Sequence, residues 1–289
     1  MAAVAMFAVM DTVSKYLTRF YPVTTVLCAR YVFHTLLVIV VLGPRLGFAL
    51  VRTARPLLQT LRGASLAGAS LCFVGALKYM PVAETSAISF VAPLLLTLMA
   101  VVVLKEKVGR ARWIAVAGGF AGVLIIIRPG SAIFAWASVL PLGTAVLFAS
   151  YQILTRRVAG LESPYVSNFY SGLVGMLVFA MLSLPYGSVL PRTAFHAALF
   201  ALIGIIGGLS HLTLIKAYEF APASRLAPFS YTQLIWATLT GYLVFGDFPD
   251  RWSLVGIVVV MASGVYIATH QHLATRLERA QLPAAPSGT

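Results

Sequence analysis

Ionisable side chains interrupt the apolar runs of this chain at only a few places. Asp11 and Lys15 lie one helical turn apart in the first run, and Arg30 stands alone in the second. A charge in hydrocarbon is costly, so it usually faces a partner or a water-filled cavity. Asp11 and Lys15 are therefore candidates to bind a solute, and Arg30 is a candidate to bind an anionic group or to hold Asp11. The alternatives are a local Asp11–Lys15 pair and snorkelling of the basic groups toward lipid phosphates.

Further polar candidates lie in the second half of the chain. Gln152 stands 141 positions after Asp11 and follows Tyr151, so these two side chains are a second candidate surface for a solute. His211, between Ser210 and Thr213, has an unperturbed pKa near neutrality and suits a proton-linked group. The alternative for His211 is a hydrogen bond to a neighbouring carbonyl.

Hydroxyl and aromatic groups form a matched set at the same offset. Ser89-Phe90 precedes Pro93, and Ser230-Tyr231 follows Pro228. Proline kinks a helix and frees carbonyls, and aromatic rings beside a kink can stack on a planar solute. Gln233 and Trp236 continue this surface by one turn. The alternative is that these rings face lipid or pack in the core.

Sites of other kinds are missing from the sequence. It has no phosphate-binding Gly-x-x-x-x-Gly-Lys-Ser/Thr loop and no His-Glu-x-x-His pair, so neither ATP hydrolysis nor metalloprotease chemistry is expected. Its two cysteines, Cys28 and Cys72, lie in apolar segments and are expected to be packing thiols. We expect no enzyme activity, no cofactor and no metal.

Composition predicts an all-α, polytopic membrane protein. Hydrophobic residues make up 60% of the chain, charged residues 10%, and the mean hydropathy is +0.92. A bilayer core of about 30 Å needs about 20 apolar residues per helix. Ten apolar stretches are predicted as membrane helices: 2–17, 23–42, 61–77, 85–104, 113–127, 137–154, 166–184, 197–217, 226–245 and 254–269.

An internal repeat divides these helices into two sets of five. ALKYMPVAETSAISFVAPLLLTLMAVVVLKEK returns without a gap as AYEFAPASRLAPFSYTQLIWATLTGYLVFGDF, which places Pro81 on Pro222 and Glu106 on Asp247. Five is an odd number, so the second set must enter the membrane from the opposite side. The sequence therefore predicts two inverted five-helix repeats, 1–130 and 131–270, and a disordered cytoplasmic tail, 271–289. Substrate sites in such repeats lie near the midplane between the halves.

The net charge of +13 follows from topology rather than from nucleic-acid binding. With ten spans and the N-terminus inside, the cytoplasmic loops carry more than twice as many Lys and Arg as the outer loops. This bias is the positive-inside rule. We expect a multi-pass protein of the inner (plasma) membrane with both termini in the cytoplasm, in contact with the lipid bilayer and a small-molecule substrate. Nucleic acid is not expected, and the oligomeric state, a homodimer included, stays open.

Short motifs carry a family resemblance over nearly the whole chain. They are Pro22 to Arg30, Pro81-Val82-Ala83-Glu84 leading to Pro93, Leu104-Lys105-Glu106, Ala221-Pro222-Ala223 and Phe245-Gly246-Asp247. In these the chain resembles the drug/metabolite transporter superfamily, of the kind built from two EamA-type repeats. Asp247 stands where Glu is commoner in the family. MDTVSKYL and FSYTQLIWATLTGYLVFGD look like a bacterial branch that includes uptake systems for riboflavin and S-adenosylmethionine.

The resemblance implies a secondary-active transporter of a small organic metabolite that works by alternating access. It implies riboflavin-type or S-adenosylmethionine-type uptake, or export of amino acids or other metabolites. One rival hypothesis is a membrane-embedded partner or lipid-handling protein that transports nothing water-soluble. Its polar residues would pair with one another and its interior would stay closed. An intramembrane enzyme is a third hypothesis, and no acid–base pair suited to it is visible.

Overall fold

Helices make up nearly all of the described structure. The computed structural model describes residues 2–95, 98–99, 109–128, 136–158, 161–186, 191–220 and 231–281, without the side chains of 111–112, 156, 214–220 and 267–281. The helices are α1 (Ala2–Leu17), α2 (Val23–Leu46), α3 (Pro56–Leu77), α4 (Val82–Ser89), α6 (Arg110–Ile127), α7 (Val139–Val158), α8 (Pro164–Ser183), α9 (Ala194–Phe220), α11 (Thr232–Phe245) and α12 (Arg251–Gln281). Short 3-10 helices cover Gly47–Leu50, Trp136–Ser138 and Leu184–Tyr186.

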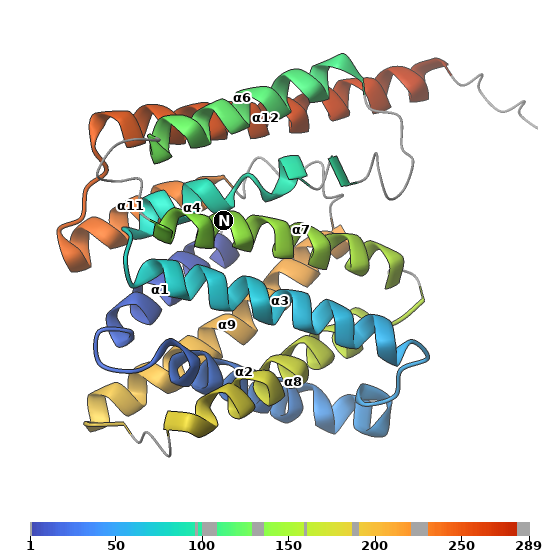
Figure 1. Ribbon diagram of the computed structural model, residues 1–289. Coiled ribbons are helices and arrows are strands. Elements are labelled where there is room, and N and C mark those ends of the chain that lie inside the picture. Colours follow the sequence, from blue (N-terminus) through green and yellow to red (C-terminus); the bar gives the residue numbers. More distant parts are fainter. Residues whose placement is uncertain are drawn as a thin grey trace, which may run out of the picture.

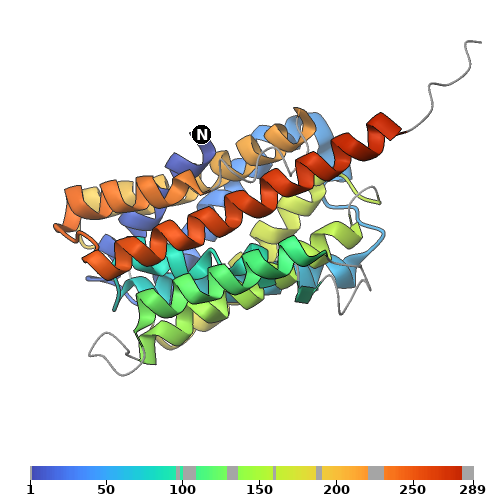
Figure 2. The same ribbon diagram turned by 90° about the horizontal axis from the view of Figure 1, so that it is seen from above.

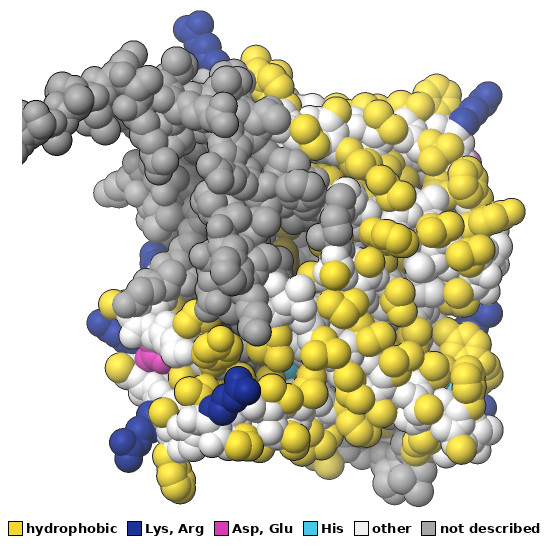
Figure 3. Space-filling view, turned by 180° about the vertical axis from the view of Figure 1, so that it is seen from behind, with side chains coloured by type: hydrophobic (Ala, Val, Ile, Leu, Met, Phe, Trp, Pro, Cys, Tyr) yellow, Lys and Arg dark blue, Asp and Glu magenta, His cyan; other side chains and the backbone are white. Residues whose placement is uncertain are grey.

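The outer surface of this bundle is apolar. On the described part of the face seen in Figure 3, hydrophobic side chains far outnumber charged ones, and most Lys and Arg side chains in that view project at its edges. By length and composition, α2, α3, α7, α8 and α9 can each cross a bilayer, and apolar helices at 82–95, 113–127 and 251–266 are shorter. Side chains such as Val40, at 69% exposure, and Leu243, at 71%, therefore suit contact with lipid rather than water.

Local sequence explains where several helices begin and end. Pro56 and Pro164 occupy the first turn of α3 and α8, where a missing N–H costs nothing. Ser163 caps α8 by accepting a hydrogen bond from the backbone N–H of Tyr165. Gly246 ends α11 with φ +72°, a left-handed conformation that glycine adopts without steric cost.

Three of the boundaries that differ from the sequence prediction have a clear local cause. Helix α2 continues through Gly43-Pro44 to Leu46, because a proline near the end of a long helix removes only one hydrogen bond. Helix α4 ends at Ser89, and a turn precedes Pro93, whose missing N–H would leave the carbonyl of Ser89 unpaired in a continuous helix. Helix α12 runs to Gln281, past the predicted start of the tail, because no Pro or Gly interrupts 265–281.

Glycines allow a close helix contact between α6 and α12. These two helices run side by side in both ribbon views (Figures 1 and 2). A Cβ added at Gly256 would lie 2.6 Å from the backbone oxygen of Gly122, and a Cβ at Gly122 would lie 3.0 Å from that of Gly256. Association in lipid depends on this kind of close van der Waals contact, since burial from water contributes little there.

Contacts between the first five helices and the last five come in matched pairs. If α1, α2, α3, α4 and α6 are matched in order with α7, α8, α9, α11 and α12, the contact of α1 with α9 corresponds to that of α7 with α3. In the same way α1–α11 corresponds to α7–α4, and α2–α9 to α8–α3. Helices α2 and α8, α4 and α11, and α6 and α12 contact their own counterparts.

Candidate functional site

Three polar contacts join the second half of α1 to α11 and the segment that follows it. Gln233 Nε2 donates a hydrogen bond of 3.5 Å to Asp11 Oδ2. Thr12 Oγ1 donates one of 2.7 Å to Thr240 Oγ1. Lys15 Nζ lies 2.6 Å from Asp247 Oδ2. The i, i+4 spacing of Asp11 and Lys15 places both on the face of α1 that meets α11, so one helix face carries both groups.

Asp11 is buried within this interface, with only 4% of the residue exposed. Its carboxylate accepts the hydrogen bond from the Gln233 amide and lies within electrostatic range of Arg30 on α2. The structure thus brings together three of the predicted residues from three helices. Acid, amide and guanidinium in one buried region can bind a solute that offers both a donor and an acceptor.

Arg30 reaches this region through a gap left by a glycine. A Cβ at Gly207 of α9 would lie 3.9 Å from Arg30 Nε and 3.2 Å from Met10 Sδ. Arg30 is 9% exposed. Within the described part of the chain its guanidinium forms neither a hydrogen bond nor an ion pair.

His211 lies beside the same group of residues. Its ring stacks on that of His34, with centroids 5.6 Å apart and planes at 20°, and Phe7 contacts it edge-on at 5.1 Å. His211 is half-buried, whereas His34 is 3% exposed. The structure therefore places the predicted proton-linked residue against His34 and within electrostatic range of Arg30.

Lys15 takes a partner that helical spacing did not suggest. The sequence left open a local Asp11–Lys15 pair, but Lys15 pairs with Asp247 at the end of α11. The Phe245 ring lies 4.7 Å from Lys15 Nζ and equally close to the Arg19 guanidinium. Nearby, Arg128 pairs with Asp250. One end of the molecule is thus closed by ion pairs that join α1 to α11 and α6 to the start of α12.

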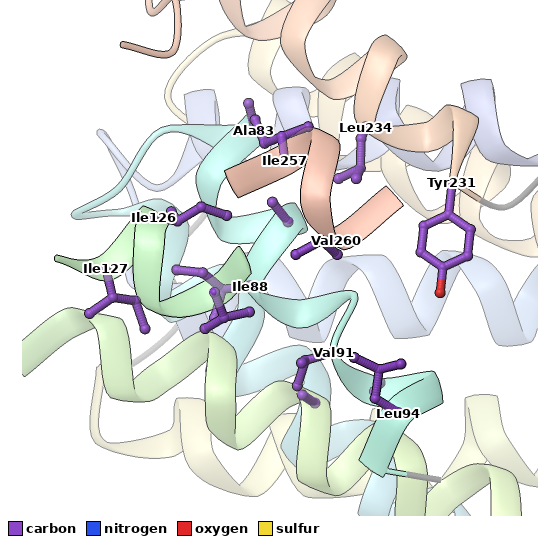
Figure 4. Close-up of a cluster of buried hydrophobic side chains, with 14 of the residues drawn as sticks. Ala83, Ile88, Val91, Leu94, Ile126, Ile127, Tyr231, Leu234, Ile257 and Val260 are labelled. Atoms are coloured by element: carbon purple, nitrogen blue, oxygen red, sulfur yellow. The ribbon is translucent and has the colours of Figure 1, made fainter. Parts of the chain in front are cut away.

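The aromatic candidates lie on a different surface. The rings of Phe90 and Tyr231 meet with centroids 5.3 Å apart. Tyr231 is 3% exposed and belongs to the apolar cluster that contains Ile88 and Val260 (Figure 4). Its ring packs on Gly264, where even a Cβ would clash. Tyr231 therefore contributes packing between α11 and α12 rather than a polar contact with Asp11.

The remaining predicted residues are scattered. Ser89 donates a long hydrogen bond of 3.4 Å to the carbonyl of Pro141. Trp236 is 39% exposed on the outer surface, apart from the Asp11 group. Ser230 lies outside the described residues, as do Glu106 and Pro228.

A buried residue that the sequence argument missed is Arg62. It lies near the start of the predicted helix 61–77, where it was not named as a candidate, and it is 2% exposed inside the α3–α7–α8 junction. Its guanidinium contacts the carbonyl of Ser167 and donates to Ser171 Oγ at 2.7 Å, and it lies 5.2 Å from the Tyr151 ring. Tyr151 thus contacts Arg62 rather than Asp11. The next residue, Gln152, is half-buried. Gln59, which is 0% exposed, lies three residues earlier on the same helix face. This i, i+3 spacing of two polar residues is the sequence feature that could have indicated a buried Arg62.

Glu162 forms several hydrogen bonds at the end of the helix bundle opposite the Lys15–Asp247 pair. Its carboxylate accepts hydrogen bonds from Thr53 Oγ1 and the Ala54 N–H, each 2.6 Å, and from the Arg55 N–H. Burial raises the pKa of Glu162, but these hydrogen bonds outweigh it, so the net pKa lies below its usual range. The connection between α2 and α3 is thereby fastened to the start of α8.

Metal binding finds no support in the residues that the structure describes. They contain no group of three or more His, Cys, Asp or Glu side chains arranged to hold an ion. Cys28 and Cys72 are free and half-buried.

The sequence of this chain is similar to those of known membrane transporters. Residues 1–128 and 135–269 match the model of the EamA-like transporter family. The S-adenosylmethionine uptake transporter of Rickettsia prowazekii is 26% identical over 257 residues, which cover 89% of this chain and 86% of that protein. The riboflavin transporter of Vibrio cholerae is 31% identical over 286 residues, covering 94% of this chain and 92% of that protein.

Two further similarities are more distant. The pseudopaline exporter of Pseudomonas aeruginosa is 25% identical, with 91% of this chain and 92% of that protein covered. One solved structure superposes with a TM-score of 0.65 at 18% identity over 93% of this chain and 98% of its own, which shows a shared fold. The family and these relatives are multi-pass membrane transporters rather than enzymes. Since the family match covers nearly every residue, the chain belongs to the EamA-like transporter family, as its motifs had indicated.

Proposed function

We propose that this protein is a secondary-active transporter that moves a small organic metabolite by alternating access. The observation that carries this proposal is the Asp11–Gln233 contact, with Arg30 beside it, buried between α1 and α11 in a chain of 60% hydrophobic residues. Buried polar groups in membrane helices normally face a partner or a solute. Arg30, Asp11, Gln233 and His211 are the proposed substrate-contacting residues.

The proposed architecture is ten spans in two inverted repeats, 1–130 and 131–270. The two separate family matches and the matched helix contacts support it. So does one residue pair. Thr12 and Thr240 meet between α1 and α11, and their equivalents at the 141-residue offset, Ile153 and Met99, also pack together. Rocking one half against the other would open these two interfaces alternately.

The proposed location is the inner membrane, with both termini in the cytoplasm. The excess of basic residues in the loops on that side supports this orientation. In this orientation the Lys15–Asp247 pair lies at the outer end and the Glu162 contacts lie at the cytoplasmic end.

The proposed substrates are those for which the relatives are named, S-adenosylmethionine or riboflavin for uptake, with a metabolite for export as the other direction. All three are polar organic molecules, which fits a site that combines an acid, an amide and a guanidinium.

Uptake by proteoliposomes tests the proposal. Purified protein is reconstituted and offered labelled S-adenosylmethionine, riboflavin and a panel of amino acids, with and without a proton ionophore. We expect saturable uptake of at least one solute, which Asp11→Asn reduces at least about tenfold by removing a charge-assisted contact. Thr238→Val, on α11 away from Asp11, is the matched control and retains uptake. Absence of uptake for every solute in both directions would refute the proposal.

A further inference from the structure

Buried cations in this protein differ in how they are satisfied. Lys15 pairs with Asp247, as the less buried Arg128 does with Asp250. Arg62 has no carboxylate partner in the described residues, but a carbonyl and three hydroxyl groups surround its guanidinium. Arg30 has neither kind of partner among the described residues. Among the buried cations that the structure describes, Arg30 is the one that uses none of its donors.

The unused donors of Arg30 stay partly accessible, although the residue as a whole is buried. The residue is 9% exposed, yet none of its nitrogens is among the fully enclosed polar atoms without a partner, so each keeps some accessible surface. Gly207 leaves space at its Nε. An enclosed guanidinium without an anion is costly, and its planar fork matches an oxyanion at two points.

Asp11 does not fill this role. It lies in electrostatic range of Arg30, but the two form no ion pair, and the Asp11 carboxylate binds the amide of Gln233 instead. Acid and base thus stand apart, each with hydrogen-bonding capacity left over. Because the two groups do not pair, the donors of Arg30 are left available to a ligand group.

We infer that Arg30 receives a carboxylate group of the transported solute, with Asp11 left to accept from a donor on the same solute. The inference rests on the proposed function and narrows its substrate class. With Asp11 ionised, Arg30 and Asp11 together carry no net charge, and a carboxylate then fits better than a phosphate. A dianionic group would add two negative charges to a neutral pair in a low-dielectric region, whereas a carboxylate beside a protonated amine adds none.

The test compares solutes that differ in one group. S-adenosylmethionine is paired with its decarboxylated form, methionine with 3-(methylthio)propylamine, and riboflavin with flavin mononucleotide. Uptake of each is measured in proteoliposomes for the unsubstituted protein, Arg30→Gln, Arg30→Lys and the control Arg52→Gln, whose side chain is exposed. The melting temperature of each variant without solute verifies that it is folded.

A carboxylate solute should be taken up at least about tenfold better than its decarboxylated partner, since a charge-assisted pair is lost. In Arg30→Gln this preference should fall to near unity, while uptake of the decarboxylated partner persists. Arg30→Lys should keep part of the preference, because the charge remains and the fork is lost. Arg52→Gln should keep all of it.

Other outcomes overturn the inference. Transport confined to solutes without a carboxylate, or a preference that survives Arg30→Gln, removes Arg30 from this role and leaves the proposed function standing. An Arg30-dependent preference for flavin mononucleotide over riboflavin replaces carboxylate by phosphate and contradicts the charge argument. Failure of every solute in the unsubstituted protein removes the proposed function as well.

Discussion

Lys15 Nζ lies 2.6 Å from Asp247 Oδ2, and this ion pair joins the ends of α1 and α11. The Lys15 side chain is 11% exposed and that of Asp247 35%, so the pair is half-enclosed and partly screened from solvent. In the proposed inverted arrangement these helices belong to different halves. The contact must therefore break whenever this end opens.

Breaking the ion pair should shift the protein toward states open at this end. Asp247→Asn removes one charge, and for a half-enclosed pair we expect a change of about 1 kcal/mol, or about fivefold in the closed-to-open ratio. The measurement is the rate at which a thiol reagent labels Thr12→Cys, in a background without Cys28 and Cys72. Faster labelling is expected in Asp247→Asn than in the parent. Restoration by the exchanged pair Lys15→Asp with Asp247→Lys is the control, and equal rates in all variants would contradict a gating role.

Gln233→Ala should affect transport more than stability. Its amide donates to Asp11 at 3.5 Å, a long contact that contributes little to folding but occupies the proposed solute position. We expect the apparent KM to rise at least about threefold while the melting temperature changes by less than about 2 °C. Thr240→Val, which removes the hydrogen bond with Thr12 on the same interface, should show the opposite balance. A KM unchanged in Gln233→Ala would remove this residue from the site.

Hydropathy predicted most of the helices because lipid imposes a length on each apolar run. Helix α1 matches its prediction at both ends, and Pro56 or Pro164 accounts for the earlier starts of α3 and α8. Helix α4 was predicted less well, because hydropathy continues through a proline whose missing N–H ends the regular helix. The repeat was visible from the sequence because equivalent residues keep one offset.

Partners across helices could not be predicted in the same way. Asp247 is 232 positions from Lys15, whereas Asp11 is only four positions away. The packing of α1 against α11 is what makes Asp247 the partner of Lys15. Arg62 was not named as a candidate, because hydropathy does not register that hydroxyls of α7 and α8 can enclose a guanidinium. Tyr231 was predicted to line a cavity. Its ring instead packs in the apolar cluster, because Gly264 has no side chain to occupy that space.

The glycine contact between α6 and α12 should be intolerant of side chains. Gly256→Val would place a Cβ 2.6 Å from the carbonyl of Gly122, so the helices must separate. Overpacking of this kind costs about 1–3 kcal/mol, and a clear fall in the melting temperature is expected. Gly109→Ala is the control, since a Cβ there meets nothing within 4 Å. A Gly256→Val protein as stable as the control would show that α12 can move away from α6 at no cost.

Asp250 should make stability depend on pH at the start of α12. Its Oδ1 accepts the Ser253 N–H at 2.8 Å, and this bond, together with Arg128, holds the pKa of Asp250 below its usual range despite some burial. A lowered folded pKa means that the carboxylate stabilises the protein above the unfolded value of about 3.9, and that this contribution is lost as pH falls through the folded value. Asp250→Ala should therefore lower the free energy of unfolding at pH 7 by about 1 kcal/mol for a lost cap, which is measured as a lower melting temperature. The difference from the parent should shrink below about pH 4. Asp250→Asn keeps a capping oxygen without the charge, so its deficit at pH 7 should be smaller. A deficit in Asp250→Ala that stays constant from pH 7 to pH 3 would mean that the carboxylate charge contributes nothing at this helix end.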